Sequence, residues 1–209
     1  MSIYRHPSEK KFLYIHIPRT GGRFIEANLE STEWRCEPID LYGIPHFNHS
    51  FIEDCEITHF PRELYEKYFD VDGIPHVSVI RDPVDRFFSA SIYLTQAYGP
   101  NIQESAEDES QLYAMIRDLP MVEALGWFRQ QIDYLSDKTN IWRYENGLGR
   151  RFSKWLSGIV GMDIKMNAFL KYPMNNRERT SQLARTDKLV DNIKKMYNED
   201  IEQLYHALK

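Results

Sequence analysis

The sequence predicts an α/β fold of three layers, in which helices flank a central, mostly parallel sheet. Two short apolar runs, at 12–17 and 76–80, are each followed by a tight turn and then by apolar residues at helical spacing. The chain closes with a long amphipathic stripe. Strands that alternate with helices are typical of parallel sheets, because each connection between parallel strands needs a crossover, usually a helix.

The first strand, turn and helix come early in the chain. Residues 12–17 are predicted to form a short buried strand, which ends at Pro18. A helix should follow from about Gly22, with Ile25 and Leu29 on one face.

Two weaker strands are predicted at 34–39 and 56–59. Pro61 then opens a short helix with the sequence PRELYEKYF. Proline is favourable at a helix start, since the amide that it lacks would have no partner there.

The clearest unit spans 76–92. A strand at 76–80 leads to Asp82 as the N-cap of a helix and to Pro83 at its first helical position. The apolar spacing of this helix is carried by Val84, Phe87, Phe88, Ser91 and Ile92.

The second half of the chain begins with a polar, acidic loop at 100–110. Helical patterns continue to about residue 135, and a strand at 140–144 precedes a helix at 149–161. The last helix should be long and should pack on the sheet. Its apolar stripe consists of Leu189, Ile193, Met196, Tyr197, Ile201, Leu204, Tyr205 and Leu208.

Composition narrows the class of protein. The chain has 209 residues, of which 42% are hydrophobic and 27% charged, which predicts a single domain over residues 1–209. The net charge of -5 argues against a general nucleic-acid binder, because such proteins need broad positive surface. Any anionic ligand must then be held by a local pocket.

The expected location is the cytoplasm. No apolar run approaches the ~20 residues of a membrane span, and the first residues are polar where a signal peptide would be apolar. We therefore expect a soluble protein without a membrane partner. Two cysteines, Cys36 and Cys55, are too few for a disulfide framework.

The turn after the first strand predicts an anion site. It reads PRTGGRF, and its two glycines at 21 and 22 let backbone amides approach a phosphate at the start of the next helix. Arg19 and Thr20 add side-chain donors. The spacing is not the G-x-x-x-x-G-K-[ST] of a nucleoside-triphosphate loop.

The turn after the strand at 76–80 predicts a second anion contact. Arg81 follows this strand directly, and Ser89 lies eight residues later on the helix. An arginine fork and a hydroxyl can grip a phosphate. An ion pair between Arg81 and Asp82 at the helix start is the alternative. Because ligands of such sheets bind beyond the carboxyl ends of the strands, Arg19 and Arg81 should lie at the same edge.

These two motifs resemble those of sulfotransferases that use 3′-phosphoadenosine 5′-phosphosulfate (PAPS). PRTGGRF is similar to the 5′-phosphosulfate loop, whose usual form is P-K-T-G-[GS]-[ST], and RDPVDRFFS is similar to the 3′-phosphate motif R-D-P-x-x-R-x-x-S. ITHFP at 57–61 and RYEN at 143–146 resemble segments of the carbohydrate-type branch, to which heparan sulfate 2-O-sulfotransferase is related. NNRERTS at 175–181 falls where that branch has a basic loop over the nucleotide.

The resemblance implies a P-loop-like nucleotide-binding core that moves a sulfuryl group from PAPS to an acceptor hydroxyl on a carbohydrate or small molecule. It implies PAP as product and no metal. The nucleotide-binding residues that it implies are Arg19, Thr20, Gly21, Gly22, Arg23, Phe24, Arg81, Ser89, Arg177, Arg179 and Thr180. Arg19 replaces the usual lysine of the loop, and Arg23 replaces its usual Thr or Ser.

By the resemblance, His59 occupies the position of the catalytic histidine of the carbohydrate-type branch and is the expected base, with Arg19 as the second catalytic residue. A histidine is suited to take the proton of the acceptor hydroxyl near neutral pH. The alternatives for the base are Glu26, His46 and His49. A zinc site formed by His46, His49, Cys55 and His59 is a different interpretation, although its spacing matches no zinc signature.

Two other functions stay open at this point. A nucleotide-dependent phosphotransferase would bind ATP with Mg²⁺, and a non-catalytic module would bind PAP or PAPS without turnover. The aromatic residues Tyr93, Tyr98, Trp127 and Trp142 are expected in the core, with stacking on a ligand as the alternative.

Overall fold

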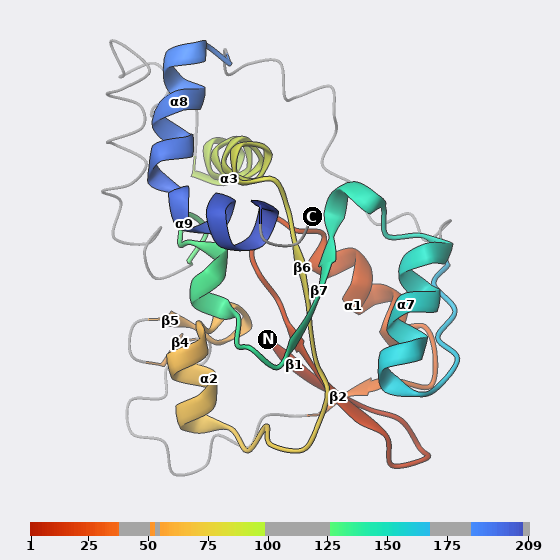
Figure 1. Ribbon diagram of the computed structural model, residues 1–209. Coiled ribbons are helices and arrows are strands. Elements are labelled where there is room, and N and C mark those ends of the chain that lie inside the picture. Colours follow the sequence, from red (N-terminus) through yellow and green to blue (C-terminus); the bar gives the residue numbers. More distant parts are fainter. Residues whose placement is uncertain (38–50, 53–54, 99–125, 168–184, 207–209) are drawn as a thin grey trace.

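The protein is a mixed α/β structure built around one five-stranded sheet (Figure 1). The structure is a computed structural model, and it describes residues 1–37, 51–52, 55–98, 126–167 and 185–206. The order of the strands across the sheet is β3-β1-β2-β6-β7. Figure 1 shows α1 and α7 to one side of these strands, and α2, α3 and α8 to the other.

The strands that carry the two motifs are parallel neighbours. β2 (Lys11–Ile15) pairs with β6 (His76–Ile80), and β6 pairs in turn with β7 (Thr139–Arg143). The register places Ile15 opposite Ser78. The strand predicted at 76–80 is confirmed with the same ends, and those at 12–17 and 140–144 are confirmed with ends shifted by one or two residues.

The other side of the sheet is antiparallel, so the sheet is mixed rather than parallel throughout. β1 (Ser2–Arg5) runs antiparallel to β2 and to β3 (Arg35–Cys36). A hairpin turn joins β1 to β2, with Glu9 at a positive φ of 63°. The sequence did not predict β1, because a four-residue strand followed by proline and three charges carries a weak signal.

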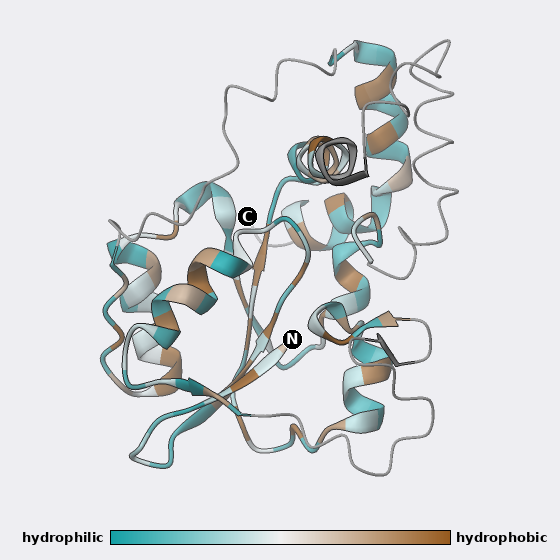
Figure 2. Ribbon diagram, turned by 180° about the vertical axis from the view of Figure 1, so that it is seen from behind, coloured by the Kyte–Doolittle hydropathy of each residue, from teal (hydrophilic) through white to brown (hydrophobic). Residues whose placement is uncertain are grey.

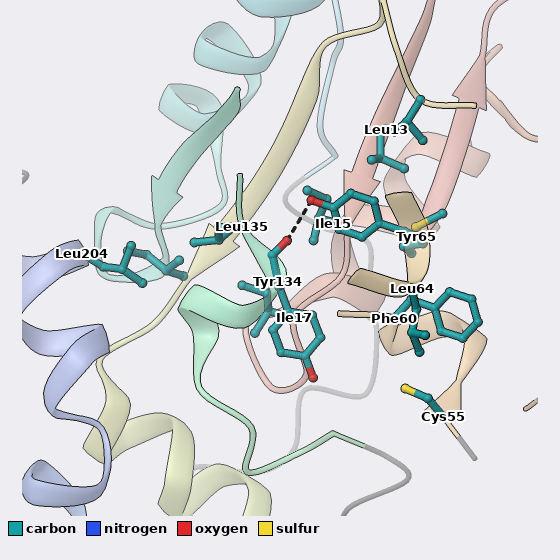
Figure 3. Close-up of a cluster of buried hydrophobic side chains, with 13 residues drawn as sticks. Leu13, Ile15, Ile17, Cys55, Phe60, Leu64, Tyr65, Tyr134, Leu135 and Leu204 are labelled. Atoms are coloured by element: carbon teal, nitrogen blue, oxygen red, sulfur yellow. Dashed lines mark hydrogen bonds between the residues drawn. The ribbon is translucent and has the colours of Figure 1, made fainter. Parts of the chain in front are cut away.

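The two faces of the sheet are both buried. Leu13, Ile15 and Ile80 pack on one face against α2 (Arg62–Tyr68), and Figure 3 shows Tyr65 of this helix donating to the carbonyl of Tyr134. The other face packs against α1 (Gly22–Glu30) and α7 (Arg150–Val160) through Phe12, Tyr14, Val77 and Val79. Successive side chains of a strand point to opposite faces of the sheet, as they do here. Burial of one such side chain stabilises by about 1.5–3 kcal/mol.

The helix starts agree closely with the sequence. α1 begins at Gly22, and α3 (Pro83–Tyr98) begins at Pro83. The Asp82 carboxylate accepts the amide of Asp85 at 3.0 Å, which confirms the predicted N-cap. α7 ends at Gly161, whose φ of 65° is left-handed. Figure 2 shows that the helices carry apolar and polar patches around their circumference, as amphipathic helices do.

The weaker predictions were only partly right. The strand expected at 34–39 is the two-residue β3, as far as the structure describes it. The strand expected at 56–59 is short: β5 (Cys55–Glu56) pairs with β4 (Phe51–Ile52), and a 3₁₀ turn η1 (Ile57–His59) follows. Helical patterns were predicted up to about residue 135, and in the described residues 126–135 they correspond to the 3₁₀ turn η2 (Gln131–Tyr134). The loop expected at 100–110 lies outside the described residues.

The C-terminal helix is broken, and its first half packs on α3 rather than on the sheet. α8 (Asp187–Met196) is followed by α9 (Asn198–Asp200) and by η5 (Ile201–His206), a π-helical turn. The shared cluster of α8 and α3 consists of Phe87, Phe88, Ala90, Leu189, Ile193 and Tyr197, with Trp127 beside them. Of the described residues of the expected stripe, Leu204 belongs to the core cluster of the sheet and Tyr205 packs against it. No helix in the ranges given above has the length and apolar character needed to cross a membrane.

Candidate functional site

The two predicted anion turns meet at one edge of the sheet. Nε of Arg19 donates to Oγ of Ser89 at 3.2 Å, and Nη1 of Arg81 donates to the carbonyl of Arg19 at 3.3 Å. Arg19 and Ser89 are separated by 70 residues in sequence. They meet because β2 and β6 are adjacent parallel strands, whose carboxyl ends share an edge.

The backbone of the first turn takes two left-handed conformations. Arg19 has a φ of 69° and Gly21 a φ of 92°. Left-handed backbone is uncommon for a residue with a side chain, and non-glycine outliers of this kind cluster at functional sites. Thr20 is fully buried, and its hydroxyl donates to the carbonyl of Ile17 at 2.8 Å. In this structure the Thr20 hydroxyl therefore supports the turn.

Close packing explains both glycines. A Cβ on Gly21 would come within 2.7 Å of Cδ1 of Leu148 and 3.1 Å of the Tyr144 ring. A Cβ on Gly22 would come within 2.1 Å of Nε2 of His16. Gly22 also begins α1, whose first turn contains no acidic residue. No carboxylate of the first turn therefore offsets the positive end of this helix, which favours an anion on the side of the turn.

The two arginines are held by aromatic rings. The guanidinium of Arg19 lies 4.5 Å from the centre of the Tyr93 ring, and that of Arg81 lies 4.8 Å from the centre of the Tyr144 ring. Within the described part of the chain, neither guanidinium forms an ion pair with a carboxylate. Burial, with added repulsion from Arg81, lowers the pKa of Arg19 to about 10. Two cations at one edge, with no carboxylate partner among the residues described, favour an anionic ligand.

Arg81 is fixed through its backbone. Its amide donates to Oε1 of Gln131, and Nε2 of Gln131 donates back to the carbonyl of Arg81, both at 2.9 Å. The carboxylate of Asp200 accepts the amides of Gln131 and Ile132, each at 2.9 Å. Gln131 and Asp200 are fully buried, and no pattern in the sequence points to either of them.

The segment RYEN also contacts the second turn. Glu145 accepts the amide of Asp82 at 2.6 Å, while Tyr144 stacks on Arg81. Nη2 of Arg143 donates to the carbonyls of Leu204 and Tyr205. The alternative ion pair between Arg81 and Asp82 is not formed in this structure, where Asp82 caps α3 and Arg81 faces Tyr144.

The second arginine of RDPVDRFFS has a structural position. Arg86 is fully buried, and its guanidinium donates to the carbonyls of Trp127 and Arg129. It lies 5.3 Å from the centre of the Tyr197 ring, so it joins α3 to the C-terminal segment.

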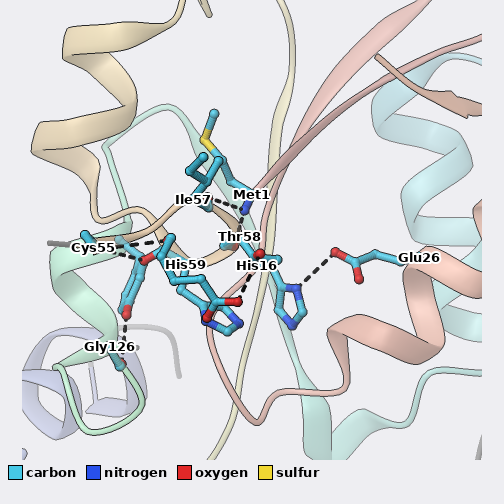
Figure 4. A network of polar contacts seen from close by, with 10 residues as sticks. Met1, His16, Glu26, Cys55, Ile57, Thr58, His59 and Gly126 are labelled. Atoms are coloured by element: carbon cyan, nitrogen blue, oxygen red, sulfur yellow. Dashed lines mark hydrogen bonds and ion pairs between the residues drawn. The ribbon is translucent and has the colours of Figure 1, made fainter. Parts of the chain in front are cut away.

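The expected base, His59, lies in a cluster of two histidines and two glutamates (Figure 4). Its Nδ1 is 2.7 Å from Oε2 of Glu56. The ring of His16 meets the ring of His59 nearly at right angles, with 5.0 Å between their centres. Nδ1 of His16 is 3.0 Å from Oε1 of Glu26. His59 and its rival Glu26 thus belong to one cluster, which His16 connects to the first turn.

The cluster changes the proton affinity of its members. Burial lowers the pKa of His59 to about 4, against the raising effect of Glu56, and His16 lowers this pKa further. Burial alone would raise the pKa of Glu26, but the charge of His16 and its hydrogen bond outweigh burial and lower it to about 2. At pH 7, His59 is therefore neutral and Glu26 is ionised.

Other predicted residues fall elsewhere. Trp127 is buried in the core, as expected, and Tyr93 and Trp142 are partly buried and pack against core clusters. Tyr93 also lies on Arg19, and Nε1 of Trp142 donates to the carbonyl of Gly147. The side chain of Tyr98 is not described. Outside the described residues lie His46, His49, Arg177, Arg179 and Thr180. Among the residues that are described, no group of three or more His, Cys, Asp or Glu side chains is arranged to hold a metal ion.

Comparison of the chain with protein-family models, with curated proteins and with solved structures gives no match. The geometry of the two turns and of the histidine cluster therefore carries the functional argument.

Proposed function

We propose that the protein is a PAPS-dependent sulfotransferase with a P-loop-like nucleotide-binding core. It would move a sulfuryl group from PAPS to the hydroxyl of a carbohydrate or small molecule. The observation that carries the proposal is the meeting of Arg19, Arg81 and Ser89 beside a glycine turn at a helix start. PAPS has phosphate groups at both ends, and two motifs that each supply an arginine suit such a ligand.

Each turn has its own part in binding. The turn with Arg19, Gly21 and Gly22 would hold the 5′-phosphosulfate through backbone amides and the positive end of α1. Arg81 and Ser89 would hold the 3′-phosphate. In this structure Ser89 accepts a hydrogen bond from Arg19. Nucleotide binding would replace this contact, because Arg19 would then contact the 5′-phosphosulfate and Ser89 the 3′-phosphate.

His59 would take the proton of the acceptor hydroxyl as the hydroxyl oxygen forms its bond to sulfur. The bond between sulfur and the bridging oxygen of the 5′-phosphate breaks, and its electron pair leaves with PAP. Arg19 and the amides of the turn would stabilise the charge that develops on this phosphate. His59 then releases its proton to water.

Calorimetric titration with PAP, ADP and ATP tests the binding step. We expect micromolar affinity for PAP and weaker binding of ADP and ATP. In Arg81→Ala the affinity for PAP should fall about 10- to 100-fold, because a charge-assisted contact is lost. The matched control is Arg62→Ala, since Arg62 is a half-exposed arginine that pairs with Glu66 on α2.

The outcomes separate the proposed function from its alternatives. Binding of ATP that equals or exceeds that of PAP would overturn the proposal and favour a phosphotransferase. Tight binding of PAP, without transfer of the sulfuryl group of PAPS to water or to any acceptor, would instead favour a non-catalytic nucleotide-binding module. Release of sulfate at a rate that depends on His59 would support the enzyme.

A further inference from the structure

His16 connects the glycine turn to the expected base. It follows β2 directly, and its Nε2 lies where a Cβ on Gly22 would be. The same ring meets His59 edge-on, and its Nδ1 contacts Glu26 on α1. The side chains of His16 and His59 are 6% and 12% exposed, so neither ring has room to reorient freely. A displacement of the turn would therefore reach His59 through one intervening side chain.

The two carboxylates define where each histidine carries its proton. Nδ1 of His59 lies 2.7 Å from Oε2 of Glu56, although the pair lacks the alignment of a hydrogen bond. Because an ionised carboxylate can only accept, this contact favours the proton of neutral His59 on Nδ1. Glu26 likewise accepts a hydrogen bond from Nδ1 of His16 at 3.0 Å. In His59 the lone pair then lies on Nε2, which is the nitrogen left to accept a proton from a substrate.

We propose that Glu56 and the His16–Glu26 pair are positioning groups for His59: Glu56 fixes its tautomer, and His16 holds its ring in register with the glycine turn. This inference rests on the proposed function, in which His59 is the base. Glu56 and His16 do not themselves touch the reacting atoms. Neither was singled out from the sequence.

The electrostatics of the cluster give the two positioning groups opposite effects. Within the described residues, the titratable groups around His59 are Glu56, His16, Glu26, the amino group of Met1 and the thiol of Cys55. Glu56 raises the pKa of His59, whereas His16 lowers it. Loss of Glu56 should therefore lower this pKa, and loss of His16 should raise it. A purely structural defect would not move the pKa in opposite directions.

Side-chain ¹⁵N NMR of the full chain tests the tautomer without any nucleotide. His59 and His16 are assigned by comparison with His59→Gln and His16→Gln. We expect neutral His59 at pH 7 with its proton on Nδ1, and loss of this tautomer preference in Glu56→Leu, which leaves no acceptor at position 56. Glu202→Leu is the matched control, because Glu202 forms an exposed pair with His206 at 3.6 Å. A proton on Nε2 of His59 in the wild type, or a tautomer unaffected by Glu56→Leu, would overturn the inference.

The second measurement is the pH dependence of sulfate release from PAPS to water, which needs no identified acceptor. Glu56→Leu should reduce the rate about tenfold or more with unchanged affinity for PAP. Its acidic limb should move to lower pH, and that of His16→Gln to higher pH. Limbs that move together, or not at all, contradict the inference. Failure of PAP to bind would instead contradict the proposed function, while the NMR result would still decide the tautomer.

Discussion

At the scale of single residues, Gly22 has the most demanding position. It begins α1 and touches the ring of His16 so closely that no Cβ fits. The ring cannot simply move aside, because Glu26 holds its Nδ1 and His59 lies against it. Gly22 therefore connects the predicted anion turn to the histidine cluster that contains His59.

Gly22→Ala should destabilise the protein by about 1–3 kcal/mol, because the added methyl overlaps a buried ring. It should also weaken the binding of PAP. Urea denaturation measures the first effect and calorimetry the second. Gly158→Ala is the control on α7, where a Cβ meets open space and alanine should stabilise by about 0.5–1 kcal/mol. Equal stability of the two variants would contradict the packing argument.

At the scale of secondary structure elements, the helix ends account for what could be predicted. Asp82 and Pro83 fix the start of α3, and Gly161 fixes the end of α7. These signals are local, because a cap bonds a backbone amide only a few residues away. The position of Arg81, one residue before this cap, follows from the same local signal.

Asp82→Ala should reduce the free energy of unfolding by about 1 kcal/mol, since the amide of Asp85 loses its acceptor. Asp82→Asn retains a capping oxygen and should cost only a few tenths of a kcal/mol. Urea denaturation of the three proteins measures this difference. If Asn proved as costly as Ala, the charge of Asp82 rather than its cap would be what stabilises α3.

At the scale of the whole molecule, the C-terminal segment supports the second turn. Asp200 bonds η2 through two backbone amides, and Gln131 of η2 bonds both backbone groups of Arg81. Arg143 adds contacts from β7 to the carbonyls at 204 and 205. Segments from three distant parts of the chain therefore position one arginine.

Asp200→Asn should destabilise the protein by about 2–3 kcal/mol, because an amide group offers one acceptor where the two backbone amides need two. The affinity for PAP should fall as Arg81 loses its support. Asp191→Asn is the matched control, since Asp191 is exposed on α8. Denaturation and calorimetry on the two variants check both effects. A stable Asp200→Asn with full affinity would show that this network does not position Arg81.

The strand and helix that flank each motif, the Asp82 cap of α3 and the glycine turn follow from the sequence alone. Periodicity, proline, glycine and capping residues act over a few positions, so each can be read locally. The tertiary structure decided the antiparallel partner β1, the break after α8 and the contacts of His16, Gln131 and Asp200. Gln131 and Asp200 lie 69 residues apart, and a polar residue shows its partner only when the fold buries the two together.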